Sequence, residues 1–376
     1  MRVIIFGNFV DHEVTLAESL SKSDRVLVLL PGRTVPERVA KLVHGGLDVR
    51  FMGRSRIQFH PANIVAYFEA WNQVRAFEPD VVHMEIFGGF ADLAYLAMFN
   101  RCPIVTTFHD VDVHKGERSS SRNMVRRILR GRADRIIVHG RFLKKAMVER
   151  FSVPAAKVEV VPLGAPEFET FRMFQRNDIR EDENLVLFFG RIVEYKGLEY
   201  LIKAEPAITK EFPDAKIVIA GGGLEFENFE KYRTMMAGRE ERFVVLNRFV
   251  SFEEGAELFQ RSSVVVLPYV EASQSGVATV AYGFKKPVVA TEVGSIPEIV
   301  HDGETGFLVP ARDSQALAEA VLRLLRDKKL RREMGERGYI MLTTSLSLDA
   351  IAAKTREVYQ NAISSRNDAA MPRRHH

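Results

Sequence analysis

The predicted fold follows from residues 267–300, which read LPYVEASQSGVATVAYGFKKPVVATEVGSIPEIV. The β-branched run Val264–Leu267 indicates a buried strand, and Pro287–Ala290 indicates a second one. Between them lies a predicted helix with apolar residues at i, i+3, i+4 and i+7, and the hydroxyls of Ser273 and Ser275 are available as N-caps. The stretch therefore predicts a βαβ unit, in which a phosphate is favoured at the helix N-terminus beside the carboxyl ends of the strands.

A second loop of the same half carries two cations. The predicted strand Leu185–Phe189 is followed by residues 190–197, GRIVEYKG, and then by a predicted helix. Gly190 permits a sharp turn, the guanidinium of Arg191 can bind two phosphate oxygens, and Lys196 supplies a point charge. Taken alone, such a pair is more often two surface cations after a turn. With the downstream helix start present, we predict a phosphate-binding site.

The first half of the chain alternates strands with helices, which predicts a parallel, doubly wound α/β sheet. Gly7 and Asn8 follow the first strand, and His109 and Asp110 follow the fifth. An imidazole at a strand end can donate or accept a hydrogen bond near neutral pH, and the alternative is a surface or capping histidine beside Asp110. We expect His83 and His139, which also follow strands, to be packing or loop residues, with His139 a second candidate for the rim of the crevice. The predicted strands are Arg2–Phe6, Arg25–Leu30, Val49–Phe51, Val81–Met84, Pro103–Thr107, Ile136–Val138 and Val158–Val161.

Composition places the chain among globular proteins. Its 376 residues suffice for two domains, 46% are hydrophobic and 27% are charged. No apolar run is long enough for a membrane span, and the first nine residues indicate a strand rather than a signal peptide. The single cysteine, Cys102, excludes an intrachain disulfide. We therefore expect a cytoplasmic protein.

The domain boundary is expected after the proline-rich segment that ends at Pro166. We predict a first domain over 1–166, a polar linker over 167–184 and a second domain over 185–345. A last helix over 346–363 is expected to return to the first domain, and 364–376 to be a disordered tail.

The most basic stretch, Lys115–Arg135, predicts a helix whose residues Arg122, Arg126 and Arg130 form one stripe. Such a stripe can contact an anionic membrane or an acceptor phosphate, although most charged stripes are solvated surface. Nucleic acid is a weaker hypothesis, because no aromatic residues alternate with the arginines.

Glu271, the small polar loop after it, the next helix and the PVVAT strand resemble the donor-site segment of the family 4 retaining glycosyltransferases, which have the GT-B fold. Residues 190–197 are similar to the diphosphate-binding loop of that family, and VVPLG at 160–164 is similar to its interdomain segment. The family often has a second glutamate where this chain has Thr279, which can hydrogen-bond a ribose but cannot make a charge-assisted pair.

The resemblance implies roles for individual residues. Glu271 would contact the hydroxyls of the donor sugar, and His109 would lie beside the transferred sugar. Arg191 and Lys196 would neutralise the departing diphosphate, so that no metal ion is needed. The implied donor contacts are Gly190, Gly222, Val250, Ser273, Gln274, Ser275, Gly276, Val277 and Thr279, and the implied acceptor contacts are Gly7, Asn8 and Asp110.

The function that the resemblance implies is transfer of a hexosyl group from a UDP-sugar or GDP-sugar to an acceptor hydroxyl with retention of configuration. No cofactor is expected besides this co-substrate, and the acceptor is expected to be an exopolysaccharide or a lipid-linked glycan at the inner face of the membrane. Two alternatives stay open: a nucleotide-sugar epimerase with the GT-B fold, and a two-lobed sugar-binding protein without catalysis.

Overall fold

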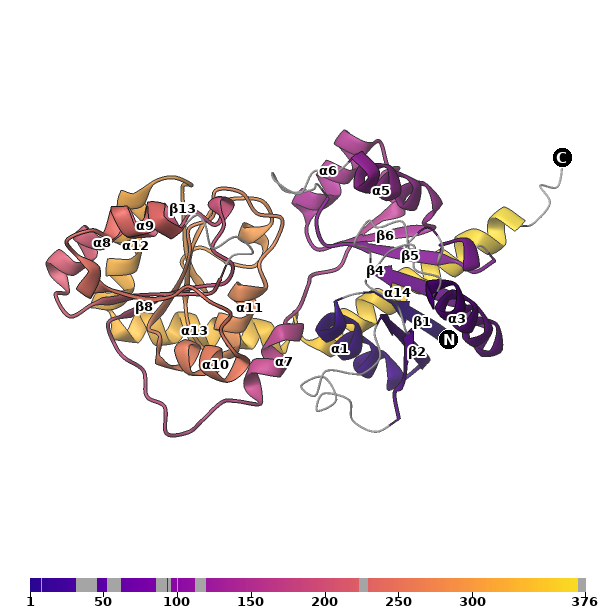
Figure 1. Ribbon diagram of the computed structural model, residues 1–376, viewed down its shortest axis with the longest axis horizontal. Helices are drawn as coiled ribbons and strands as arrows, with labels where there is room; N and C mark the ends of the chain where they lie inside the picture. The colour runs from indigo at the N-terminus through magenta and orange to yellow at the C-terminus, as the bar shows by residue number, and fades with distance from the viewer. Residues whose placement is uncertain are drawn as a thin grey trace. The chain divides into compact units, whose positions relative to one another are not determined.

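The computed structural model describes residues 1–7, 9–31, 46–52, 62–85, 93, 96–99, 101–111, 120–222 and 229–370. The chain forms two compact units, drawn with their element labels in Figure 1. The first unit comprises Met1–Pro166 together with Leu348–His376, and the second comprises Glu167–Ser347.

The first unit contains a seven-stranded sheet in the order β3-β2-β1-β4-β5-β6-β7, and every neighbouring pair is parallel. Because β2 and β3 lie on one side of β1 and β4 to β7 on the other, the strand order reverses between β1 and β4. Ligands of open parallel sheets bind at such a reversal, beyond the carboxyl ends of the strands. The strands are β1 (Arg2–Phe6), β2 (Arg25–Pro31), β3 (Asp48–Met52), β4 (Val81–Glu85), β5 (Ile104–Phe108), β6 (Arg135–Val138) and β7 (Val158–Val160).

Helices cover both faces of this sheet. Strand β1 shows the alternation, since Val3 and Ile5 pack with one set of helices and Ile4 and Phe6 with the other. The first set is α1 (Val10–Ser21) and α14 (Leu348–Ala370), and the second is α3 (Ala62–Phe77), α5 (Ser120–Arg132) and α6 (Arg141–Phe151).

The second unit contains a six-stranded parallel sheet in the order β10-β9-β8-β11-β12-β13, so its strand order reverses between β8 and β11. The doubly wound α/β class predicted for both halves is confirmed. The strands are β8 (Leu185–Phe189), β9 (Lys216–Ala220), β10 (Phe243–Leu246), β11 (Val264–Leu267), β12 (Val288–Thr291) and β13 (Gly306–Val309). The helices are α7 (Pro166–Arg172), α8 (Leu198–Glu211), α9 (Phe229–Met236), α10 (Phe252–Arg261), α11 (Gly276–Gly283), α12 (Ser314–Arg326) and α13 (Lys328–Thr343).

The segment predicted as a polar linker, 167–184, instead packs into the second unit. Phe168 of α7 lies 5.5 Å from Phe284, and Phe171 lies 5.6 Å from Phe259, both measured between ring centroids. Further along, the Ser263 hydroxyl donates a hydrogen bond to the carbonyl of Asp182. Two buried phenylalanines inside a mostly polar segment account for the difference.

The tail predicted to be disordered from Ser364 is also helical as far as Ala370, since α14 continues there. Arg366 anchors it by donating hydrogen bonds to the carbonyl of Cys102 and to the carboxylate of Asp134. Residues 371–376 lie outside the described part of the chain. Among the described helices, none has the length and apolar character needed to cross a bilayer.

A half-buried carboxylate, Glu181, pairs with two buried cations of the second unit. The Glu181 carboxylate lies 2.8 Å from Lys286 Nζ and 3.0 Å from Arg331 Nη2. Both cations are almost fully buried, with 6% and 2% of their surface exposed. Burial lowers the pKa of Lys286, and Glu181 opposes that shift. Removing the carboxylate would therefore leave two buried charges without their counterion.

We predict that Glu181→Ala lowers the free energy of unfolding by about 3 kcal/mol in urea titrations at pH 7, because a broken buried pair costs roughly that much. The matched control is Glu183→Ala, which breaks an exposed ion pair with Lys328. Exposed pairs contribute less than about 1 kcal/mol, so the control should stay close to the wild type. Equal effects of the two substitutions would contradict the assignment of 167–184 to the second unit.

Candidate functional site

In the second unit, the loop after β8 lies against the end of β11, at the reversal of strand order. Gly197 has a φ of +63°, and a Cβ at this position would lie 1.9 Å from the carbonyl oxygen of Pro268. Only glycine tolerates both this conformation and this approach. The backbone N–H of Val270 also donates to the carbonyl of Tyr195 at 2.8 Å. The two predicted phosphate-binding loops are therefore joined.

Lys196 is held beside the first turn of α11 through a tyrosine. Its Nζ donates to the hydroxyl of Tyr269 at 2.6 Å and lies 4.1 Å from the centroid of that ring. The same hydroxyl lies 3.2 Å from Oγ of Ser275, the residue that precedes α11. Tyr269 and Ser275 are buried, so the three groups form a fixed chain of contacts. A positive side chain thus lies near the N–H groups of a helix N-terminus, which is the composition of an anion site.

The hydroxyl of Ser275 does not cap α11, contrary to the sequence prediction. Ser275 occupies the N-cap position, but its side chain makes no capping hydrogen bond to the helix. It interacts with Tyr269 instead. The first N–H groups of an α-helix have no partner inside the helix. Those of α11 therefore receive no hydrogen bond from the Ser275 side chain and can bind another acceptor.

Arg191 and Glu271 lie on the same joined loops and are exposed. Arg191 Nη2 donates to the hydroxyl of Tyr195 at 3.3 Å, and the N–H of Glu271 lies 3.5 Å from the carbonyl of Tyr195. Tyr195 therefore ties both residues to the loop that carries Lys196. Their contacts with a diphosphate and with a sugar stay predictions.

Three further predicted donor residues lie around Lys196 and the start of α11. A Cβ built on Gly190 would lie 3.8 Å from Lys196 Nζ and 3.9 Å from Cγ2 of Val277, and at Gly276 it would lie 3.1 Å from the Glu167 carboxylate. Residues 190 and 277 therefore border Lys196, whereas residue 276 borders the carboxylate of Glu167 at the start of α11.

The other predicted donor residues are less accessible or lie further along the edge. Thr279 is 1% exposed, and its hydroxyl donates to the carbonyl of Gly276, so the group expected to bind a ribose is used within the helix. Val250 is buried. Gly222 packs on the backbone of Arg248, where a Cβ would approach to 3.0 Å.

Two residues of the loop 273–276, which reads SQSG, differ in their hydrogen bonds. The carbonyl of Ser273 accepts a hydrogen bond from the N–H of Ser295 at 3.3 Å. Oε1 of Gln274 is buried and has no hydrogen-bond partner among the described residues. An unpaired buried acceptor is costly, so a ligand that donates to Gln274 would be favoured here.

The first unit has a buried polar cluster beside Gly7, where its own strand order reverses. Its members are His12, Glu13, Glu85, His109 and His139. A Cβ on Gly7 would lie 2.8 Å from Cβ of Glu85 and 1.9 Å from Oε1 of Glu13, so a larger residue here would displace the side chains of the cluster. Glu13 Oε1 accepts the N–H of Phe9 at 2.9 Å, and burial followed by the charge of Glu85 raises the pKa of the Glu13 carboxyl well above its usual range. Asn8, the other predicted residue of this loop, lies outside the described residues.

Glu85, the last residue of β4, connects two histidines in this cluster. Its Oε1 lies 2.5 Å from Nδ1 of His12, and its Oε2 lies 3.1 Å from Nε2 of His109. Burial alone would raise the pKa of Glu85, but His12 and His109 hold the pKa of that carboxyl well below its usual range. The other nitrogen of His109, Nδ1, lies 3.1 Å from Nε2 of His139. His139, in the bend after β6, is thus a buried member of this cluster, which agrees with the prediction of a packing residue.

His109 is 8% exposed, and both of its ring nitrogens have hydrogen-bond partners within the first unit. The ring of Phe9 lies 4.1 Å from its ring, centroid to centroid. Contact with a sugar would require one of these bonds to be exchanged, so that role stays a prediction. Its neighbour Asp110 offers its carbonyl to Arg126.

Sequence reasoning missed His12, Glu13 and Glu85. The available signal was position: Glu85 ends the strand next to β1, and His12 and Glu13 begin the helix after β1. The ligand atoms of His12, Glu85 and His109 lie within 4.8 Å of one another. Because the carboxylate gives a separate oxygen to each ring, hydrogen bonds account for this arrangement, and we assign no metal to it.

The basic stripe predicted on α5 does not form one exposed surface. Arg126 is buried and donates a hydrogen bond to the carbonyl of Asp110, with its guanidinium 5.3 Å from the Phe108 ring. Arg130 lies over the ring of Phe151 at 4.1 Å, and Arg122 alone of the three is exposed. Packing against aromatic rings thus decides the positions of Arg126 and Arg130.

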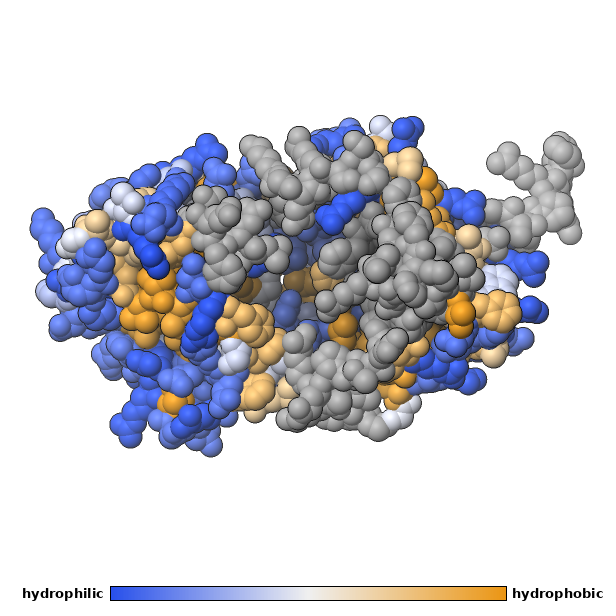
Figure 2. All heavy atoms as spheres, viewed as in Figure 1, coloured by the Kyte–Doolittle hydropathy of each residue, from blue (hydrophilic) through white to orange (hydrophobic). Residues whose placement is uncertain are grey.

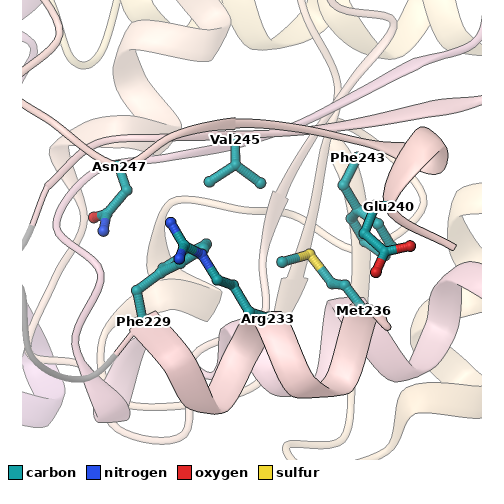
Figure 3. Close-up of a pocket in the computed structure, with 7 residues that line it drawn as sticks. All are labelled: Phe229, Arg233, Met236, Glu240, Phe243, Val245 and Asn247. Carbon is teal, nitrogen blue, oxygen red and sulfur yellow. The ribbon is translucent and has the colours of Figure 1, made fainter. Parts of the chain in front are cut away.

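A pocket of about 340 Å³ lies elsewhere in the second unit, between α9 and the edge strand β10. Figure 3 shows Arg233 and Met236 rising from α9 toward the segment that carries Phe243 and Val245. Val244 and Val245 of this edge strand are partly exposed, and Figure 2 shows apolar surface among hydrophilic side chains on the viewed face of the unit. None of the predicted donor residues lines this pocket.

Comparisons with known proteins cover almost the whole chain. Residues 169–341 match the family described as "Glycosyl transferases group 1", and residues 12–166 match "Glycosyltransferase Family 4". The chain is 30% identical over 279 residues to the GDP-mannose-dependent alpha-(1-6)-phosphatidylinositol monomannoside mannosyltransferase of Mycolicibacterium smegmatis, which covers 67% of this chain and 69% of that protein. It is 31% identical over 191 residues to the alpha-D-kanosaminyltransferase of Streptomyces kanamyceticus, about half of each protein (50% and 49%).

Among solved structures, Anabaena Alr3699/HepE in complex with UDP and glucose superimposes with a TM-score of 0.73 at 17% identity, covering 95% of this chain and 99% of that chain. This likeness shows the fold. Together with the family matches, it shows that the chain belongs to the group 1, family 4-type glycosyltransferases with the GT-B fold.

His83 makes stability depend on pH on the acid side. Its ring lies between the hydroxyls of Tyr359 (2.8 Å) and Thr107 (2.6 Å), and burial lowers the pKa of His83 to about 4. Below the ordinary histidine pKa of about 6.5, the unfolded chain binds a proton here that the folded chain does not. The free energy of unfolding therefore decreases as the pH is lowered.

We predict that, between pH 7 and pH 4.5, the wild type loses about 2.5 kcal/mol more unfolding free energy than His83→Gln does. Urea titrations at the two pH values measure this difference. The control is His301→Gln, at an exposed histidine, which should keep the pH dependence of the wild type. The same pH dependence in His83→Gln and the wild type would show that His83 is not held neutral.

Proposed function

We propose that this glycosyltransferase transfers a hexosyl group from a nucleoside diphosphate sugar to an acceptor hydroxyl, with retention of configuration and without a metal ion. The observation that carries the proposal is the chain of contacts from Lys196 through Tyr269 to Ser275, at the start of α11. A cation and a row of helix N–H groups together suit the two phosphates of such a donor.

The chemistry follows from the charge that develops during transfer. As the bond between the anomeric carbon and the diphosphate oxygen breaks, negative charge grows on the departing diphosphate. An ammonium and backbone N–H groups that are already oriented stabilise this charge without reorganisation. In the retaining route that we propose, the acceptor oxygen bonds the anomeric carbon on the face that the diphosphate leaves, and the acceptor proton passes to the diphosphate.

Names of relatives support the donor and acceptor classes. The Mycolicibacterium relative is named for GDP-mannose and for a phosphatidylinositol monomannoside, and the Anabaena structure contains UDP and glucose. We infer that the donor of this chain is a UDP-sugar or a GDP-sugar. The acceptor that we propose is a polyol or sugar hydroxyl of a polysaccharide or a lipid-linked glycan.

Lys196→Ala should lower turnover by at least about 100-fold, because removing one oriented donor from developing charge has that scale of effect. It should also abolish the thermal shift that UDP or GDP gives to the wild type, since ligand binding to the folded state raises its apparent stability. The control is Lys203→Ala, at an exposed lysine of α8 that packs on Tyr200. Retained turnover and thermal shift in Lys196→Ala would refute the diphosphate site.

Stereochemistry and metal dependence are tested with the wild type. NMR of the freshly formed product should show the same anomeric configuration as the donor, and EDTA should leave turnover unchanged. Inversion, or loss of activity that a divalent ion restores, would contradict the corresponding part of the proposal. Epimerised donor formed without any acceptor would instead identify an epimerase.

A further inference from the structure

Four hydrogen-bond contacts connect His12, Glu85, His109, His139 and the carbonyl of Val161 into one buried chain. The contacts run from His12 Nδ1 to Glu85 Oε1 (2.5 Å), from Glu85 Oε2 to His109 Nε2 (3.1 Å), from His109 Nδ1 to His139 Nε2 (3.1 Å), and from His139 Nδ1 to Val161 O (2.9 Å). We name this set the histidine chain.

Each of these contacts requires one hydrogen. A carbonyl and an ionised carboxylate supply none, and a neutral imidazole supplies one. Three neutral imidazoles therefore supply three hydrogens for the four contacts of the histidine chain. The last contact fixes one of them, because only a donor at His139 Nδ1 can bond the carbonyl of Val161.

We propose that the histidine chain holds one additional proton in the folded protein, carried by His109 as an imidazolium that donates to both Glu85 and His139. With this proton, every contact has its hydrogen, and the carboxylate and the imidazolium cancel in charge. Glu85, His12 and His139 then act as positioning residues that fix the orientation and charge of His109.

Burial gives the reason for the proton. Glu85 is 1% exposed, and a buried carboxylate without a positive partner is strongly unfavourable. A second hydrogen on His12 would serve none of the four contacts, since only its Nδ1 takes part. His109 contacts the carboxylate directly and His139 does not, and burial also lowers the pKa of His139 well below its usual range. His12 and His109 keep the pKa of the Glu85 carboxyl well below its usual range, so the carboxylate stays ionised and the additional proton belongs on an imidazole.

Other titratable groups face the histidine chain from every element around it. His83 is bonded to Tyr359 and Thr107, and Glu13 accepts the N–H of Phe9. Among the residues that the structure describes, these groups are Asp11 and Glu13 on α1, His83 on β4, Asp110 after β5, Arg126 on α5 and Tyr359 on α14. Glu13 needs a control, because the pKa of its buried carboxyl is raised and its titration could contribute to the measured pH dependence.

The direct test is the wild type itself. Two-bond ¹H–¹⁵N NMR spectra at pH 7.5 should show both ring nitrogens of His109 protonated and only Nδ1 of His139 protonated. A neutral His109 with one N–H would overturn the proposal. A zinc titration would also overturn it, if one equivalent of zinc binds the purified protein and the N–H signals of His12 and His109 disappear.

Glu85→Gln is the matched variant, because the carboxamide supplies the missing hydrogen. Its oxygen can accept from His12 and its N–H can donate to His109, so three neutral imidazoles now complete all four contacts. His109 should therefore lose its second proton in this variant while the other cross-peaks of the first unit stay in place. A doubly protonated His109 in Glu85→Gln would overturn the proposal.

Stability at alkaline pH gives an independent readout. Between pH 7 and pH 9, unfolded histidines are neutral, so folding of the wild type takes up a proton and its stability is lost as pH rises. The ratio of folded to unfolded protein should fall about tenfold more per pH unit than in Glu85→Gln. Both proteins should carry Glu13→Gln, which removes titration at that carboxyl. Equal slopes would overturn the proposal.

The consequence for catalysis rests on the proposed function. In a glycosyltransferase assay, kcat of the wild type should decline on the alkaline side as the histidine chain loses its proton, and Glu85→Gln should lack this decline and be less active at pH 7.5. The spectra and the unfolding slopes do not depend on turnover. An error in the proposed protonation of His109 can thus be distinguished from an error in the proposed transferase reaction.

Discussion

The hydrogen bond from Lys196 to the hydroxyl of Tyr269 is the interaction on which the account of the second unit depends. It converts a flexible lysine into a fixed charge, because the tyrosine is buried and its hydroxyl also contacts Ser275. Without it, Lys196 would be one of many surface cations. With it, an ammonium is placed beside a helix start whose N-cap side chain makes no capping bond.

Topology explains why polar groups collect where they do. In each sheet the strand order reverses once, between β1 and β4 and between β8 and β11. The loops on either side of a reversal diverge, which opens the carboxyl edge to side chains and ligands. The histidine chain begins at the first reversal, and Lys196 lies at the second. The two groups differ in chemistry, since one is a buried network close to neutral charge and the other a partly exposed cation.

Sequence reasoning predicted what depends on local pattern. Apolar runs gave most strand positions, and the glycines and cations of residues 190–197 gave the loop that holds Lys196. It failed where side-chain partners decide the outcome. Ser275 resembles an N-cap, yet a tyrosine six residues earlier takes its hydroxyl. Arg126 has the spacing of a surface stripe, yet the Asp110 carbonyl and the Phe108 ring hold it in the interior. Glu85 follows an ordinary strand pattern, and only the sheet order brings it to His12 and His109.

A structure of the protein with UDP or GDP bound is the most direct test of the central claim. We expect the diphosphate within hydrogen-bond distance of Lys196 Nζ and of the N–H groups in the first turn of α11. A diphosphate bound away from α11, with Lys196 still on Tyr269 and turned from the ligand, would contradict it.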